Sequence, residues 1–313
     1  MVRLIIRRAN KLTLNGHLSS EAQRILNQQQ SALSGRSDTN LAELRAATKA
    51  HITPAVERVL KYTKVTTREI TINGVSCMEV NPPEVTAPWP ILYGFGGGFI
   101  QGSPFEDLTI AAPLCAMTGT VLIIPNYRLA PEHPWPAAID DGFSVYQALC
   151  DRPFAIVGES AGGNLMLALM LRAKKAGLNL PKAAALLSAW CDLDTSSDSQ
   201  RFNDGRDPSL ATQDSKIASN FYAGHNDITN PDISPINGSY DSDFPPCLIT
   251  TGTRDLLLSL SIRLARVLRE SGVDVDLQVW EGLWHVFEWD DRIPEANQSL
   301  SNIAVFLSRH FSQ

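Results

Sequence analysis

A serine flanked by two glycines lies where the sequence changes from a strand pattern to a helix pattern. The pentapeptide GESAG at residues 158–162 follows the apolar run at 154–157 and opens the helical pattern at 161–175, with Ser160 at its centre. Glycines two positions on either side permit a turn so sharp that side chains there would clash, and this turn exposes the serine hydroxyl. The pentapeptide alone is a weak signal, since a plain glycine-bearing turn is the alternative. Its flanking strand and helix favour Ser160 as a nucleophile.

Serine is a poor nucleophile at neutral pH, so a base must remove its proton and an acidic group must orient that base. Where this turn carries a nucleophile, the chain order is serine, acid, histidine. Three histidines follow Ser160, namely His225, His285 and His310. His310 lies in the C-terminal helical pattern and His225 in a polar stretch, whereas His285 follows the last predicted strand, at the carboxyl edge of a sheet. We predict His285 as the base, with a structural histidine as the alternative.

An aspartate follows the penultimate predicted strand in the same way. Asp255 ends the segment LITTGTRD at residues 248–255, where the orienting carboxylate is expected. The alternative is that Asp255 only caps the following helix, because aspartate is a favoured N-cap residue. Asp192 and Asp194 follow an earlier strand and rank lower. Asp255 is therefore the predicted acid.

Three consecutive glycines at positions 96–98 follow the predicted strand at 91–93. A chain without side chains can approach a substrate closely and offer its amides to the negative charge that develops on an attacked carbonyl oxygen. The run is not a dinucleotide-binding fingerprint, because Phe99 occupies the third glycine position. We predict an oxyanion-binding loop, with a flexible turn as the alternative.

Apolar strands alternate with helical patterns over most of the chain. The predicted strands lie at residues 91–93, 121–124, 154–157, 184–187, 248–249 and 277–280. The predicted helices lie at residues 136–149, 161–175 and 256–270. This alternation indicates an α/β fold, with a mostly parallel central sheet flanked by helices on both faces. Period-two alternation from Arg68, followed by Asn73-Gly74, predicts an antiparallel hairpin ahead of that sheet.

Residues 192–243 interrupt this rhythm. They are polar, rich in Asp, Ser and Asn, and contain three prolines. A long irregular excursion inside a compact α/β domain is more often a lid or binding element than a linker, and a decorated surface loop is the alternative. The first fifty residues show helical apolar spacing and no strand pattern.

Composition narrows the class of protein. The 313 residues are 44% hydrophobic and 19% charged, as in an ordinary globular protein. A net charge of −6 argues against a nucleic-acid-binding surface. The apolar stretches are too short for a signal peptide or a bilayer span, which predicts a cytoplasmic protein with no stable membrane association. The five cysteines are odd in number and scattered, which predicts reduced, buried thiols and no zinc site.

Four motifs, taken in order, make the chain resemble the hormone-sensitive-lipase family of bacterial esterases over roughly residues 65–310. They are the glycine run with Phe99, YRLAPEHPWPAA at residues 127–138, GESAGGN at residues 158–164, and Asp255 with His285. The resemblance implies an α/β-hydrolase fold with oxyanion donors at the amides of Gly97, Gly98 and Ala161.

The family pattern also implies a helical cap formed by residues 1–50 and 192–243, on a catalytic domain formed by residues 51–191 and 244–313. It makes the segment around His133 structural. One departure is visible, because Phe95 stands where the family usually has a histidine that holds the oxyanion loop by hydrogen bonds. We expect the Phe95 ring either to hold this loop by packing or to leave it more mobile.

The sequence therefore predicts a serine carboxylesterase that works through an acyl-enzyme and needs neither cofactor nor metal. Its partner is a small-molecule ester, and the cap implied by the resemblance favours short- to medium-chain acyl groups. Two alternatives remain open: amidase or deacetylase chemistry at the same site, and a non-catalytic small-molecule receptor on the same scaffold, although such receptors lack a working histidine. The oligomeric state, a homodimer included, is left open.

Overall fold

A mostly parallel sheet forms the centre of the protein. The computed structural model describes residues 18–32 and 40–311, so residues 1–17 and 33–39 of the predicted cap lie outside the described residues. Within the described part, eight strands form one sheet in the order β1-β2-β4-β3-β5-β6-β7-β8. Strand β2 is antiparallel to both of its neighbours, and all other neighbours pair in parallel. The predicted sheet is confirmed.

The strands agree closely with the apolar runs of the sequence. They are β1 (Thr66–Ile72), β2 (Val75–Asn81), β3 (Ile91–Gly94), β4 (Leu122–Pro125), β5 (Ala155–Glu159), β6 (Ala184–Leu187), β7 (Cys247–Gly252) and β8 (Val275–Trp280). The central strands β3 to β7 are buried along their full length, which explains why each is apolar without alternation. The predicted hairpin joins β1 to β2, and its two turn residues, Asn73 and Gly74, both have positive φ.

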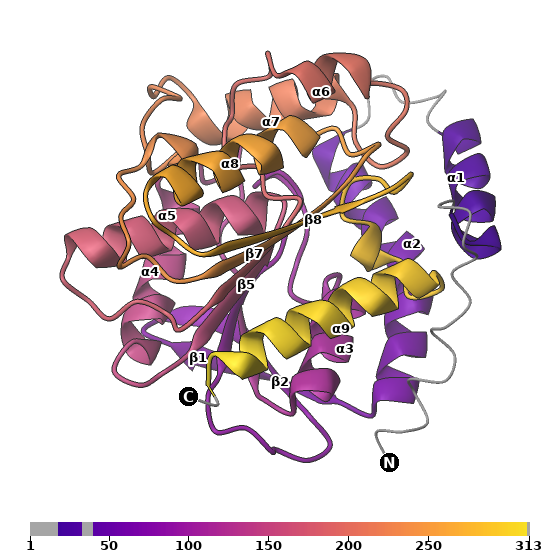
Figure 1. Ribbon diagram of the computed structural model, residues 1–313. Helices are drawn as coiled ribbons and strands as arrows, with labels where there is room; N and C mark the ends of the chain where they lie inside the picture. Colours follow the sequence, from indigo (N-terminus) through magenta and orange to yellow (C-terminus); the bar gives the residue numbers. More distant parts are fainter. Residues whose placement is uncertain (1–17, 33–39, 312–313) are drawn as a thin grey trace.

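Helices cover both faces of the sheet. They are α1 (Ser20–Ala32), α2 (Leu41–Thr63), α3 (Leu108–Thr118), α4 (Ala137–Leu149), α5 (Ala161–Lys175), α6 (Asp198–Phe202), α7 (Thr212–Ala223), α8 (Leu258–Glu270) and α9 (Pro294–Arg309), with short 3-10 helices η4 (Pro235–Asn237) and η5 (Phe287–Trp289). Helices α4, α5 and α8 lie on one side of the sheet, and α3 and α9 lie on the other (Figure 1). Helix α5 is buried over its first ten residues, as expected of a helix whose apolar residues face all directions.

The segment from 192 to 243 is more ordered than its composition indicates. It contains α6, α7 and η4, and it passes over the end of the sheet nearest to α8 (Figure 1). Helix α2 continues unbroken across residue 50, so the predicted division between cap and catalytic domain falls inside a helix. The N-terminal elements therefore join the rest of the chain at the end of α2, near Thr63.

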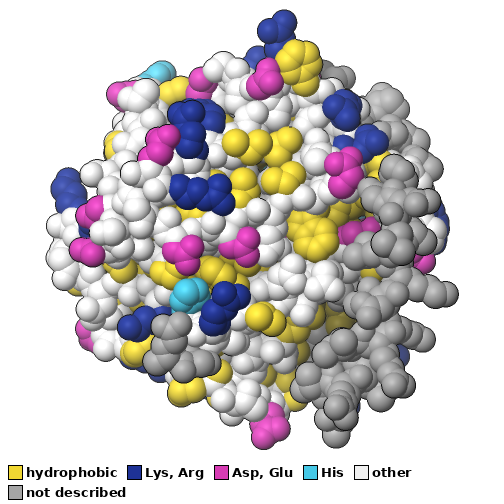
Figure 2. Space-filling view, in the orientation of Figure 1, with side chains coloured by type: hydrophobic (Ala, Val, Ile, Leu, Met, Phe, Trp, Pro, Cys, Tyr) yellow, Lys and Arg dark blue, Asp and Glu magenta, His cyan; other side chains and the backbone are white. Residues whose placement is uncertain are grey.

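Three other features of the described chain bear on its class. None of the helices in residues 18–32 and 40–311 is long and apolar enough to cross a membrane. All five cysteines are buried and unpaired, as predicted. On the face seen in Figure 2, Lys and Arg side chains are interspersed with Asp and Glu and do not form one basic patch.

Candidate active site

Ser160 lies on a strained turn between β5 and α5. Its φ of 51° and ψ of −117° are rarely adopted by a residue other than glycine. The turn requires glycine at 162, because a Cβ atom there would lie 2.0 Å from the carbonyl oxygen of Gly94 on the neighbouring strand β3. The same holds before the serine, where a Cβ on Gly158 would lie 2.5 Å from the Gly162 carbonyl oxygen. Side chains at positions 158 and 162 would therefore clash, as the pentapeptide predicts.

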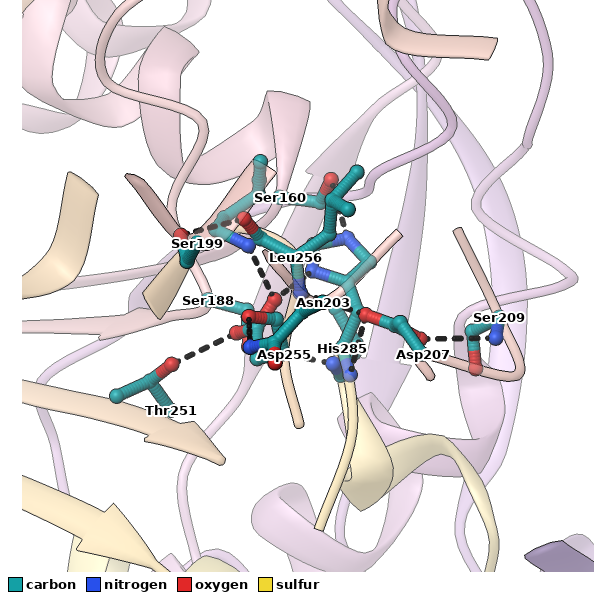
Figure 3. Close-up of polar contacts among 12 residues, drawn as sticks. Ser160, Ser188, Ser199, Asn203, Asp207, Ser209, Thr251, Asp255, Leu256 and His285 are labelled. Atoms are coloured by element: carbon teal, nitrogen blue, oxygen red, sulfur yellow. Dashed lines mark hydrogen bonds and ion pairs between the residues drawn. The ribbon is translucent and has the colours of Figure 1, made fainter. Parts of the chain in front are cut away.

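The three side chains selected from the sequence meet at one end of the sheet (Figure 3). The His285 Nε2 atom lies 2.9 Å from Ser160 Oγ, and the His285 Nδ1 atom lies 3.0 Å from Asp255 Oδ1. Ser160 and His285 each keep 8% of their surface exposed, whereas Asp255 is fully buried. These contacts form an unbroken hydrogen-bonded path from carboxylate to hydroxyl, the geometry that nucleophile activation requires.

Asp255 does not serve as the cap of helix α8. The N-cap of α8 is Leu257, and Asp255 instead accepts hydrogen bonds from the Leu257 amide at 2.8 Å and the Thr251 hydroxyl at 2.7 Å. Ser188, just beyond β6, also hydrogen-bonds to this carboxylate. These contacts hold the carboxylate where its Oδ1 atom accepts a hydrogen bond from His285 Nδ1–H.

The charges of this pair stabilise each other. Burial by itself raises the pKa of Asp255, but the nearby His285 charge and several hydrogen bonds outweigh it, so the pKa lies below its ordinary value. Burial lowers the pKa of His285, yet the charge of Asp255 and its hydrogen bond raise it more, so the net pKa is above 6.5. A raised pKa makes the neutral imidazole a stronger proton acceptor.

Beside the site lies a buried carboxylate, Asp207, which the sequence did not point to. It comes from the segment 192–243 and is 1% exposed. Its Oδ2 atom accepts from the amides of Leu256, at 2.7 Å, and His285, at 3.3 Å, while Oδ1 accepts from the Ser209 amide at 2.9 Å (Figure 3). The inserted segment is therefore bonded directly to the loops of the acid and the base. No spacing pattern in the sequence distinguishes Asp207 from the other aspartates of this polar segment.

The glycine loop lies beside the nucleophile. Gly97 and Gly98 line the same cavity as Ser160 and His285. In the described part of the chain, the loop amides of Gly97 and Gly98 and the amide of Ala161, the first residue of α5, donate to no backbone carbonyl in a turn or loop, which leaves them available to a ligand. Ala161 begins helix α5, whose N-terminus also favours negative charge.

Packing of Phe95, at the position where the related family usually has a histidine, holds the glycine loop. The Phe95 ring is fully buried and stacks on Tyr127, with the ring centroids 4.0 Å apart. The Tyr127 hydroxyl donates to the Phe95 carbonyl oxygen at 2.6 Å. From helix α2, the guanidinium of Arg45 donates to the carbonyl oxygens of Ile100 and Ala130. Of the two outcomes expected for Phe95, the structure has the packed one.

A cavity of about 680 Å³ opens above Ser160. Helix α2 contributes one wall, and the segment 192–243 contributes another. Residues from these two sources include Leu44, Thr48, Ile52, Leu210 and Ala218. Trp190, Trp284 and Trp289 line it as well, and charged residues that include Arg58, Asp214 and Arg292 line other parts of its wall.

Two further observations concern the other side chains considered as chemical groups. Within residues 18–32 and 40–311, no three His, Cys, Asp or Glu side chains are grouped so that they could hold a metal ion. Of the other histidines weighed above, His310 packs edge-on against Phe306 at the end of α9. His285 is the one that the fold brings to Ser160.

Comparison with known proteins gives consistent matches. A family model described as the alpha/beta hydrolase fold matches residues 91–289. An esterase of Acinetobacter venetianus is 34% identical over 247 residues, which are 76% of this chain and 80% of that protein. An acetyl-hydrolase of Streptomyces hygroscopicus is 29% identical over 69% of this chain and 74% of that protein. A crystal structure of a hormone-sensitive lipase from a metagenome library is 32% identical, with a TM-score of 0.87, over 94% of this chain and 99% of that chain.

Proposed function

Because the chain belongs to the α/β-hydrolase fold family, and within it to the hormone-sensitive-lipase group, we propose that it hydrolyses carboxylic esters with Ser160 as nucleophile. His285 is the general base and Asp255 the carboxylate that orients it. The observation that carries this proposal is the hydrogen-bonded path from Asp255 through His285 to Ser160, with contacts of 3.0 and 2.9 Å. The names of the related proteins, an esterase and an acetyl-hydrolase, agree with this reaction class.

The reaction proceeds in two halves. Ser160 Oγ attacks the ester carbonyl carbon while its proton passes to His285 Nε2, and the imidazolium then gives that proton to the departing alcohol. This leaves an acyl group on Ser160. Water then attacks the acyl carbonyl, His285 again takes the proton, and the carboxylic acid leaves as Ser160 recovers its hydrogen. Asp255 stays ionised throughout and stabilises the imidazolium.

The amides of Gly97, Gly98 and Ala161 are the proposed donors to the oxyanion. Such amides need no reorganisation as charge develops, so each donor lowers the barrier by about 3 to 4 kcal/mol. Their free hydrogens and their place at the same cavity support this assignment.

A helical cap is the proposed source of substrate selection. Among the described residues we assign it to 18–32, 40–63 and 192–243, with residues 64–191 and 244–311 as the catalytic domain. Support comes from the cavity walls, which α2 and the inserted segment both supply. A cavity of about 680 Å³ bounded by α2 and the inserted segment suits short- to medium-chain acyl esters better than long-chain triglycerides. A panel of p-nitrophenyl esters graded by acyl length measures this preference.

Amide or deacetylase chemistry would use the same residues and the same cavity. The two reactions differ in the leaving group, because an amine must be protonated before it departs whereas an alcohol leaves more readily. Matched ester and amide substrates with one acyl group separate them, and we expect the ester to have the higher kcat/KM.

Ser160→Ala tests the nucleophile. We expect hydrolysis of p-nitrophenyl acetate to fall by at least about 10³-fold while the circular dichroism spectrum is unchanged. The matched control is Ser242→Ala, which removes an exposed serine. The wild-type chain should also take up one equivalent of an organophosphonate ester, a reaction that a non-catalytic receptor would not give. Retention of more than a tenth of the activity in Ser160→Ala would reject this nucleophile.

A further inference from the structure

A pair of acidic side chains, Glu159 and Asp107, lines the same cavity as the glycine loop and lies outside the path from Asp255 to Ser160. Glu159 is the last residue of β5 and directly precedes the nucleophile, and Asp107 occupies the N-cap position of helix α3 without a capping side-chain hydrogen bond. They are 5% and 2% exposed. A hydrogen bond joins the two carboxyl groups. Because two adjacent buried carboxylates cannot both be ionised at low cost, this pair retains one proton between them.

The contacts of this pair lead to the loops of the proposed site. Asp107 accepts from the Trp289 Nε1–H at 3.2 Å, and Trp289 lies four residues beyond His285. It also accepts from the Tyr93 hydroxyl at 3.0 Å, near the end of β3 where the glycine loop begins. One proton-sharing pair therefore contacts elements that lead to the base and the oxyanion donors.

Glu159 reaches the glycine loop itself. Its carboxyl group accepts a hydrogen bond from the backbone amide of Gly96, the first glycine of the run. The approach is so close that a Cβ atom on Gly96 would lie 2.0 Å from Glu159 Oε1. This contact explains why the run starts one residue before the two glycines whose amides face the cavity.

We propose that Glu159 and Asp107 are positioning residues, which by sharing one proton hold the Gly96 end of the oxyanion loop and the Trp289 end of the histidine loop in the geometry for hydrolysis. This inference rests on the proposed function and extends it. Glu159 donates the shared proton to Asp107 and keeps its other oxygen for the Gly96 amide. Asp107, as the carboxylate, accepts from three donors at once.

The electrostatic setting keeps the proton on the pair over a wide pH range. Burial raises the pKa of Asp107 to about 7 and raises that of Glu159 well above its usual range. The titratable groups that act on the pair from the surrounding elements are all acidic, namely Tyr93, Tyr127, Glu106 and Glu288. The charges of Glu106 and Glu288 disfavour a second negative charge on the pair, whereas the Tyr93 hydroxyl donates a hydrogen bond that favours the charge on Asp107. If the last proton leaves as the pH rises, the two carboxylates repel each other, and this repulsion disturbs the contact between Glu159 and Gly96.

Glu159→Gln is the decisive variant. A glutamine amide can donate to Asp107 and accept from Gly96, but it has no proton to lose. We expect kcat at about pH 7.5 within about threefold of wild type, and an alkaline decline of kcat/KM that is present in wild type and absent in the variant. Glu159→Ala should lower kcat by about 10- to 100-fold with KM little changed, part of the 10²- to 10³-fold effect of losing an oxyanion donor.

Asp107→Asn separates positioning from simple packing. Its amide must direct an NH₂ group at one of three donors, so it should lose at least tenfold more kcat than Glu159→Gln although both changes are isosteric. The control is Glu295→Gln on α9, a buried carboxyl that accepts from Ser19 instead, and its profile should match wild type. All profiles are measured with p-nitrophenyl acetate on the full chain.

The outcomes separate this inference from the function beneath it. If Ser160→Ala is inactive but Glu159→Gln keeps the alkaline decline, or wild type shows no decline up to about pH 10, the pair has no positioning role and the esterase proposal stands. If Glu159→Ala does not fold, Glu159→Gln alone decides. If organophosphonate labels no serine and wild type hydrolyses no ester, the function itself fails.

Discussion

Replacing Asp255 by asparagine isolates the charge of the carboxylate from its geometry. Asp255 Oδ1 accepts hydrogen bonds from His285 Nδ1–H and from the Leu257 amide, and Oδ2 accepts one from the Thr251 hydroxyl. An asparagine can keep its oxygen at the Oδ1 place and turn its NH₂ toward Thr251, whose hydroxyl can reverse and accept. The imidazole therefore keeps its tautomer, and the variant loses only the negative charge.

The contact distance sets the size of the effect. At an effective dielectric constant of about 20, opposite unit charges 3.0 Å apart attract by about 5 kcal/mol. A neutral amide oxygen retains about 1 kcal/mol of that as an ordinary hydrogen bond. We therefore expect Asp255→Asn to raise the activation barrier by about 4 kcal/mol, which lowers kcat about a thousandfold, with little change in KM.

Steady-state hydrolysis of p-nitrophenyl acetate measures this loss, and a pH profile adds a second readout. Without the Asp255 charge the pKa of His285 falls, so the acid limb of kcat/KM should move to lower pH. Asp276→Asn, at an exposed position on β8, is the matched control and should behave as wild type. A loss smaller than about tenfold, or an acid limb that does not move, would refute the assignment of Asp255.

Three further predictions follow from the same geometry. In wild type, kcat/KM should fall as the pH falls through the pKa of His285, because only the neutral imidazole accepts a proton. A profile over about pH 5 to 9 should have its midpoint above 6.5, and a midpoint well below 6.5 would contradict the raised pKa of His285. Phe95→Ala should lower the free energy of unfolding, measured in urea, by about 3 to 5 kcal/mol, because it removes the ring stacked on Tyr127. A loss under about 1 kcal/mol would show that packing does not hold the glycine loop. Asp207→Asn should lower the free energy of unfolding by about 1 to 3 kcal/mol and reduce kcat, because the NH₂ group of the asparagine must face a backbone amide. Unchanged stability and unchanged kcat would exclude a structural link between the inserted segment and His285.

Local patterns were sufficient to predict several elements to within a residue or two. The helix from Ala161 to Lys175 and the strand from Ala184 to Leu187 have the expected bounds, because apolar runs between clear boundaries report burial directly. The turn at Asn73-Gly74 was also predictable, since both positions need positive φ. Helices α6 and α7 were not predicted, because their polar composition resembles that of a loop and their order comes from contacts with the rest of the protein.

Sequence alone determined which residues could do the chemistry. The strained turn, the order of serine, acid and histidine, and the glycine run each follow from steric and chemical requirements that act over a few residues. Only the tertiary structure decided which buried carboxylates meet these loops. Asp207 and Asp107 lie in segments whose composition is ordinary, and their partners are distant in the chain. Contacts between segments far apart depend on how the sheet and helices pack, and no local pattern carries that information.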